Sequence, residues 1–237
     1  MIMAHESKGI PAISLVSLKT VESLRLVMEA SPYPLHFELS YEMTRPLLDS
    51  MREMILGSVV SIHAACPNTE YFPNLASNDP HVLQQSLIDL HASLDTANSF
   101  EAQVMVLHPG YATNQAVPSH NGRRQELLTG KEFHPYIWRE SGSICIPSYT
   151  RTGHYLQYRD NAMAHLKQFA IECRDRGVTL AIENLNPRVG YLFQTPEEMV
   201  ELVTEVPECS LCLDVGHLWI SSCLYGFDFH QGVRDIL

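Results

Sequence analysis

Short apolar or β-branched runs alternate along the chain with longer segments whose apolar residues recur at helical spacing. Six such runs occupy residues 12–18, 35–40, 58–63, 103–108, 178–183 and 210–214. Strands that are almost continuously apolar, and that alternate with helices, are typical of a parallel sheet covered by helices. The pattern therefore predicts an α/β protein, built either as an open doubly wound sheet or as a (β/α)8 barrel.

Several of the helical segments carry start and stop signals. Asp79-Pro80 opens one segment, in which leucines recur at helical spacing. A second predicted helix spans 158–176, and Gly177 ends it in the manner of a helix C-cap. Thr195-Pro196-Glu197-Glu198 has the form of a capping box, with proline at the first helical position. This box predicts a further helix that runs to about residue 205.

A long segment from about 111 to 157 interrupts the alternation of strands and helices. It separates the run that ends at His108 from the next helix, and it is rich in tyrosine, arginine and histidine. So long a connection is unusual in a compact domain, and ordered long loops are often functional. We therefore predict one domain over 1–237 with an inserted loop at about 111–157. Because the insertion follows His108 directly, we favour a lid over the active-site face rather than a surface excursion.

Four of the apolar runs end on a side chain that can bind a metal. These residues are His63, His108, Glu183 and Asp214. Desolvating such a group without a partner is costly, and the C-terminal strand ends are where parallel barrels build their active sites. A histidine taken alone is more often a hydrogen-bonded structural residue. The shared placement instead favours a site for a divalent ion (Mn, Zn, Mg or Co), to which His217 could add a ligand or a substrate contact.

Composition and charge limit the classes of partner. The chain has 45% hydrophobic residues, and a formal net charge of −11 without a basic stripe, which disfavours nucleic acid as a partner. No apolar run approaches the roughly 20 residues that span a bilayer, and the N-terminus lacks the layout of a secretory signal. We expect a cytoplasmic protein without a membrane partner. Neither a G-x-G-x-x-G turn nor a P-loop follows a strand, so a nucleotide-binding interpretation lacks its phosphate loop.

Four short motifs resemble the xylose-isomerase-like TIM-barrel superfamily, which includes sugar isomerases and epimerases and the family 2 apurinic-site endonucleases. The motifs are Ser61-Ile62-His63, His108-Pro109-Gly110, Ile182-Glu183-Asn184 and Cys212-Leu213-Asp214-Val215-Gly216-His217. The resemblance runs from about residue 35 to the C-terminus. It implies that Glu183 and Asp214 bind a catalytic divalent ion. It also implies that His217 binds substrate or a further zinc, and that His63 and His108 are zinc ligands or pocket residues.

The resemblance implies a (β/α)8 barrel, yet only six candidate strands precede the C-terminal residue Leu237. The family continues with two more strands, one of which carries a last metal-binding glutamate. We therefore expect a TIM barrel that is truncated at its C-terminus. The activity of this chain by itself depends on whether its site is complete.

Three functions follow from these residues. The first is a metal-dependent sugar or sugar-phosphate isomerase or epimerase of carbohydrate metabolism, with Glu183 as catalytic base and substrate contacts from His217, Arg188 and Tyr111. The second is a zinc-dependent endonuclease for abasic sites. The third is a non-catalytic truncated barrel. We rank the isomerase or epimerase first, with a small sugar or sugar phosphate as its partner, and we leave homo-oligomerisation open.

Overall fold

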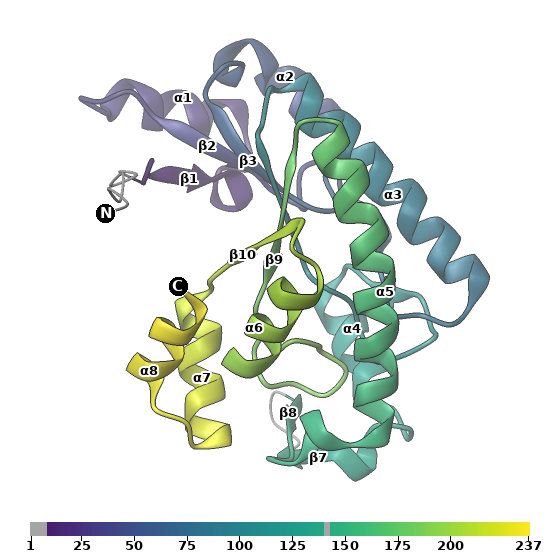
Figure 1. Ribbon diagram of the computed structural model, residues 1–237. Coiled ribbons are helices and arrows are strands. Elements are labelled where there is room, and N and C mark those ends of the chain that lie inside the picture. The colour runs from purple at the N-terminus through teal and green to yellow at the C-terminus, as the bar shows by residue number, and fades with distance from the viewer. Residues whose placement is uncertain (1–8, 140–142) are drawn as a thin grey trace.

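A parallel sheet of six strands forms the centre of the computed structural model, which describes residues 9–139 and 143–237 (Figure 1). The strands follow one another in the order β1-β2-β3-β5-β9-β10, and every pairing is parallel. Their bounds are β1 Ala12–Ser14, β2 His36–Leu39, β3 Val59–His63, β5 Val104–Leu107, β9 Thr179–Glu183 and β10 Cys209–Cys212. All six predicted strands are confirmed. The first is shorter than expected, because a 3-10 helix over Leu15–Ser17 replaces its second half.

Helices connect successive strands of the sheet, and two further helices follow β10. They are α1 Val21–Ala30, α2 Arg45–Ile55, α3 Pro80–Ser99, α5 Gly153–Asp175, α6 Pro196–Glu205, α7 Val215–Tyr225 and α8 Phe229–Ile236. In Figure 1, α3 and α5 run along one side of the strands, which agrees with the packing of α3 on β3 and β5 and of α5 on β9. None of the described helices is both long and apolar enough to cross a bilayer.

The predicted helix signals act as capping groups. Oδ1 of Asp79 accepts hydrogen bonds from the backbone of His81 and Val82 at the start of α3. The capping box at the start of α6 is present in full. Helix α5 begins at Gly153, earlier than its apolar spacing predicts, because the side chain of Thr152 caps it.

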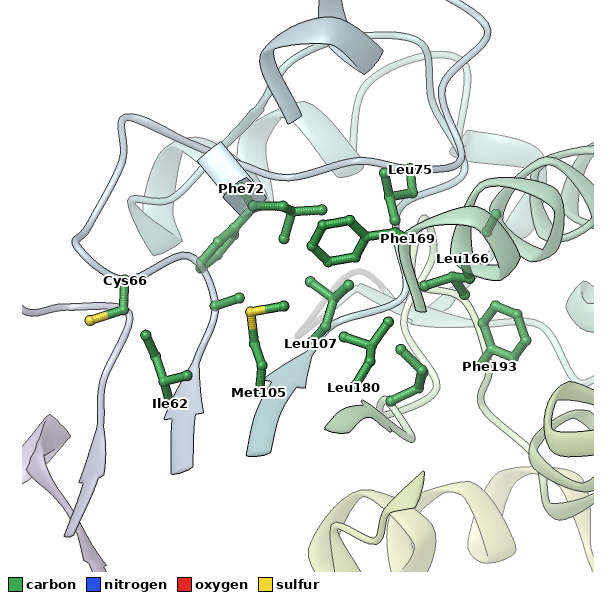
Figure 2. Close-up of a cluster of buried hydrophobic side chains, with 14 of the residues drawn as sticks. Ile62, Cys66, Phe72, Leu75, Met105, Leu107, Leu166, Phe169, Leu180 and Phe193 are labelled. Carbon is green, nitrogen blue, oxygen red and sulfur yellow. The ribbon is translucent and has the colours of Figure 1, made fainter. Parts of the chain in front are cut away.

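The six strands make a partial barrel, as expected, where a closed one has eight. Within the described residues β1 and β10 each pair with a single neighbour, so both edges of the sheet are open. The core lies between the sheet and its helices. Figure 2 shows Leu166 and Phe169 of α5 beside Leu107 of β5 and Leu180 of β9, and all four side chains are buried. This packing fixes the strands whose C-terminal ends carry the candidate site.

The described residues of the insertion fold into short helices and strands. It contains β6 Val117–Pro118, α4 Asn121–Leu128, β7 Ile137–Arg139 and β8 Ile144–Cys145, with 3-10 helices over His134–Tyr136 and Tyr149–Arg151. Strand β6 pairs with β4, which spans Tyr71–Phe72, and β7 pairs with β8.

Backbone hydrogen bonds attach the insertion to the loop between β9 and α6. Ala112 donates to the carbonyl of Gly190 at 2.7 Å, and Cys145 donates to that of Pro187 at 3.1 Å. That loop leaves the C-terminal end of β9. The insertion is therefore joined to the protein on the side of the sheet where the strands end (Figure 1).

Candidate metal centre

The five predicted metal ligands come together at the ends of β3, β5, β9 and β10. They form two groups, in each of which one ligand atom per residue lies within 4.8 Å of the others. The first group is His63, His108 and Glu183, and the second is Glu183, Asp214 and His217. Glu183 belongs to both groups and is the centre of the cluster.

Three histidines surround the carboxylate of Glu183. Its Oε2 lies 3.0 Å from Nε2 of His63 and 3.4 Å from Nε2 of His108, and its Oε1 lies 3.3 Å from Nδ1 of His217. Burial by itself raises the pKa of this carboxyl group. The hydrogen bonds from His108, His217 and His63 together outweigh burial and hold the pKa of Glu183 well below its usual range. The cluster therefore holds Glu183 as a carboxylate.

Backbone carbonyls orient two of the rings. Nδ1 of His63 lies 3.3 Å from the carbonyl of Ala64, and Nδ1 of His217 lies 2.9 Å from that of Asn184. A carbonyl oxygen only accepts, so Nδ1 of His217 carries a proton, and the neutral ring keeps its lone pair on Nε2. Nε2 of His63 instead faces the carboxylate of Glu183. Metal-binding histidines commonly use one nitrogen as the ligand and the other in such a bond.

His108 supplies the observation that tests whether a metal would fit. Burial lowers the pKa of His108 despite its contact with Glu183, which favours the neutral ring that a metal requires. Its Nδ1 is buried and has no hydrogen-bond partner among the described residues. The ring nitrogen that faces Glu183 is Nε2, so a cation beside Glu183 would bind this nitrogen of the neutral ring. Imidazole nitrogens beside carboxylate oxygens fit Zn²⁺ or Mn²⁺.

Asn184 ties the ends of β9 and β10 together, a role that the sequence alone did not reveal. Its side-chain Nδ2 donates to the carbonyl of Asp214 at 3.0 Å, and its Oδ1 accepts from the backbone of Asp214 at 2.7 Å. Asp214 is the N-cap of α7, where its Oδ1 accepts from the backbone of His217 at 2.7 Å. Its Oδ2 lies 3.7 Å from Nδ1 of His217. Asn184 thus positions two of the three ligands of the second group, Asp214 and His217.

The two remaining predicted substrate residues lie outside the cluster. Tyr111 is buried, with its ring 5.4 Å from that of Tyr191 and 6.3 Å from that of Phe72. Arg188 lies along a narrow cleft with Arg124 and Tyr191. No hydrogen bond or ion pair joins Arg188 to the five predicted ligands in the described part of the chain. Neither Tyr191 nor Arg124 was predicted as a site residue.

Gly110, which follows His108-Pro109, gives a prediction about stability. Its φ is +138°, and an added Cβ would lie 3.1 Å from Oδ1 of Asn74 and 3.2 Å from the backbone nitrogen of Ala76. We expect Gly110→Ala to lower the free energy of unfolding by about 2 kcal/mol or more, through backbone strain and crowding. Gly57→Ala is the control, because that glycine has a φ of +78° but open space around its Cβ. It should cost about 1 kcal/mol in urea denaturation. Equal losses in the two variants would contradict the crowding.

The match to a family model now identifies the class of protein. The model described as xylose isomerase-like TIM barrel matches residues 35–230. The chain therefore belongs to this family, as the motifs at the strand ends predicted. No curated protein matches its sequence.

Solved structures share the fold at low sequence identity. A D-tagatose 3-epimerase-like protein has a TM-score of 0.61 and 16% identity, over 95% of this chain and 70% of the other. A D-psicose 3-epimerase crystallised with D-fructose has a TM-score of 0.54 and 15% identity, over 84% and 58%. A Thermus thermophilus protein soaked with ZnCl₂ has a TM-score of 0.51 and 19% identity, over 88% and 66%. The chain thus spans only part of each of these proteins.

Proposed function

We propose that the protein is a divalent-metal-dependent isomerase or epimerase of a sugar or sugar phosphate. The observation that carries this proposal is Glu183, a buried carboxylate in contact with three histidines and adjacent to Asp214. Mixed imidazole and carboxylate donors at the C-terminal ends of parallel strands suit metal-assisted chemistry. The shared fold of a D-tagatose 3-epimerase-like protein and a D-psicose 3-epimerase supports the substrate class.

The residues of the cluster have distinct proposed roles. His63, His108, Glu183, Asp214 and His217 would hold the ion. A bound divalent ion supplies Lewis-acid polarisation of a carbonyl and its neighbouring hydroxyl. Glu183 would accept the proton from the carbon beside the carbonyl while the electron pair of that C–H bond moves towards the carbonyl oxygen. Return of the proton to the other carbon gives isomerisation, and its return to the other face gives epimerisation.

The histidines affect how well Glu183 can act as a base. Hydrogen bonds from three rings keep its carboxylate ionised, but they also lower its pKa and hence its proton affinity. The loss of proton affinity at Glu183 would be smaller if the ring nitrogens bound a cation and no longer donated to the carboxylate. We assign substrate contacts to His217 of the cluster, to Tyr111, and to Arg188, which lines the same cleft as Tyr191.

Exchange of the substrate α-proton with solvent tests this function. With Mn²⁺, Zn²⁺, Mg²⁺ or Co²⁺ present, we expect the chain to incorporate deuterium from D₂O into ketoses or their phosphates, as followed by NMR. Glu183→Gln should slow this exchange by about 100-fold or more, because general-base catalysis contributes that much. Glu197→Gln, an exposed carboxylate on α6, is the control and should not change the rate. Absence of metal-dependent exchange with every ketose would overturn the proposal.

One observation favours the alternative of a zinc-dependent phosphodiesterase. The two ligand groups share only Glu183, an arrangement that could hold two ions bridged by one carboxylate. A net charge of −11 weighs against a nucleic acid as substrate. Two or more zinc ions per chain, together with salt-sensitive cleavage of abasic duplex, would establish this alternative.

A further inference from the structure

Arg124 of α4 is half-buried, and its guanidinium donates hydrogen bonds only to neutral groups among the described residues. Its Nη1 donates to the carbonyls of Pro118 and Ser119, at 3.2 and 2.7 Å. Its Nη2 donates to Oδ1 of Asn121 at 3.1 Å, and its Nε donates to the hydroxyl of Tyr191 at 3.2 Å. Within the described residues no carboxylate pairs with it. The guanidinium is therefore fixed in place by neutral acceptors, and the described part of the chain gives it no acidic partner.

Aromatic rings connect Arg124 to the metal centre. The guanidinium lies over the ring of Phe72, 4.9 Å from its centroid, and that ring lies 5.9 Å from His108. Tyr191, which accepts from Arg124, has its ring 5.4 Å from that of Tyr111. Accepting this bond leaves the phenolic proton of Tyr191 available to donate. A single ring thus separates the arginine from a predicted metal ligand.

The half-buried phenol of Tyr41 and the buried phenol of Tyr111 lie near both Arg124 and Glu183. Burial is the main cause that raises the pKa of Tyr41 and of Tyr111. For each phenol the charge of Arg124 lowers the pKa and the charge of Glu183 raises it. The ring of Tyr41 also lies 5.2 Å from that of His63. The phenols therefore lie in the fields of both a cation and the anionic centre of the metal cluster.

A second arginine and an unpaired hydroxyl lie beside Arg124. Arg188, Ser143 and Tyr191 line the same narrow cleft as Arg124, and none of its lining residues is acidic. The Oγ of Ser143 is buried and has no hydrogen-bond partner among the described residues. In a chain of net charge −11, two arginines without an acidic partner and a hydroxyl without a hydrogen-bond partner, among the residues that the structure describes, indicate a local site for an anion.

We propose that Arg124 and Arg188 determine specificity by binding an anionic group of the substrate at the mouth of this cleft. This inference rests on the proposed function, since it makes the substrate a sugar that carries a phosphate ester or a carboxylate. Arginine suits such a group because its charge strengthens each hydrogen bond that it donates to an anionic oxygen. Four of the five N–H groups of Arg124 are already used, so Arg124 would contribute its charge and one hydrogen bond from Nη2. The reacting carbons would lie at Glu183 and the anionic end near Tyr191.

Calorimetric binding of matched ligands to the Mn²⁺-loaded chain tests the proposal. The ligands are D-fructose, its 6-phosphate and the corresponding 6-carboxylate, D-fructuronate, with inorganic phosphate as a competitor. We expect one anionic ketose to bind roughly tenfold or more tighter than D-fructose, because hydrogen bonds to charged groups contribute that much. The preferred anion distinguishes phosphate from carboxylate. Arg124→Gln should abolish the preference while leaving the affinities for D-fructose and Mn²⁺ unchanged.

Arg123→Gln is the matched control. Its guanidinium is exposed on the same helix and pairs with Glu70 at 3.7 Å, so the preference should persist in this variant. Tyr191→Phe leaves α4 intact and should reduce the preference in part, which keeps the test open if Arg124→Gln folds poorly.

Three outcomes would overturn the inference. They are equal binding of neutral and anionic ketoses, an unchanged preference in Arg124→Gln, and failure of all three ketoses to bind. Metal-dependent α-proton exchange without anion preference would contradict the anion site and still support the proposed function. Anion preference that depends on Arg124, without any α-proton exchange, would support the anion site and overturn the proposed isomerase or epimerase activity.

Discussion

Glu183→Gln is expected to weaken binding of Zn²⁺ and Mn²⁺ by about 100-fold or more. Removing even an outer residue that orients a ligand costs roughly 10- to 100-fold in affinity, and Glu183 is the shared centre of both ligand groups. The amide removes the negative charge and one of the two oxygens that lie between His63, His108 and His217. Titration calorimetry and elemental analysis of the purified chain measure the affinity and the number of ions bound.

A comparison with Asp214→Asn makes this prediction sharper. Asp214 belongs to one ligand group, and its Oδ1 already caps α7. We therefore expect a smaller loss of affinity, and, if two ions bind, the loss of only one. Glu197→Gln, at the exposed start of α6, should bind metal as the unaltered chain does. Metal affinity that survives in Glu183→Gln would show that this cluster is not the metal centre.

The strands could be predicted because their burial is visible in the sequence. A strand covered on both sides of a sheet must be apolar along most of its length, and the runs that become β3, β5 and β9 satisfy this condition. The beginning of α5 was harder to predict. Thr152 caps that helix within a polar segment, and the pattern of apolar residues there does not indicate where the helix begins.

The metal ligands could be predicted for a geometric reason. The C-terminal ends of parallel strands lie at one edge of the sheet, so His63 and Glu183 meet although 120 residues separate them. Arg124 and Tyr191 follow no such rule. Their contact depends on how the insertion folds back on the loop after β9, and long-range contacts between loops leave no periodic pattern in a single sequence.

The second large effect is expected at Glu198, a buried carboxylate in the first turn of α6. Its Oε1 accepts from the hydroxyl of Tyr155 at 2.5 Å, and its Oε2 accepts from the backbone of Gln194 and of Thr195, at 2.9 and 3.1 Å. The same hydroxyl of Tyr155 accepts from the backbone of Phe193 at 2.8 Å. Glu198 thus joins the start of α5 to the loop that leaves Glu183.

Glu198→Ala should lower the free energy of unfolding by about 3 kcal/mol or more, because it leaves up to three donors without an acceptor in the interior. Burial raises the pKa of Glu198, so a neutral side chain of the same size is tolerated better. Glu198→Gln should therefore recover part of the loss in urea denaturation. Glu197→Ala, one residue earlier and exposed, should change stability by about 0.5 kcal/mol or less. A loss in Glu198→Ala no larger than in Glu197→Ala would mean that other contacts hold this loop. If the loss is large while metal affinity in the folded fraction is kept, Glu198 stabilises the wall of the site and the strand ends alone hold its ligands.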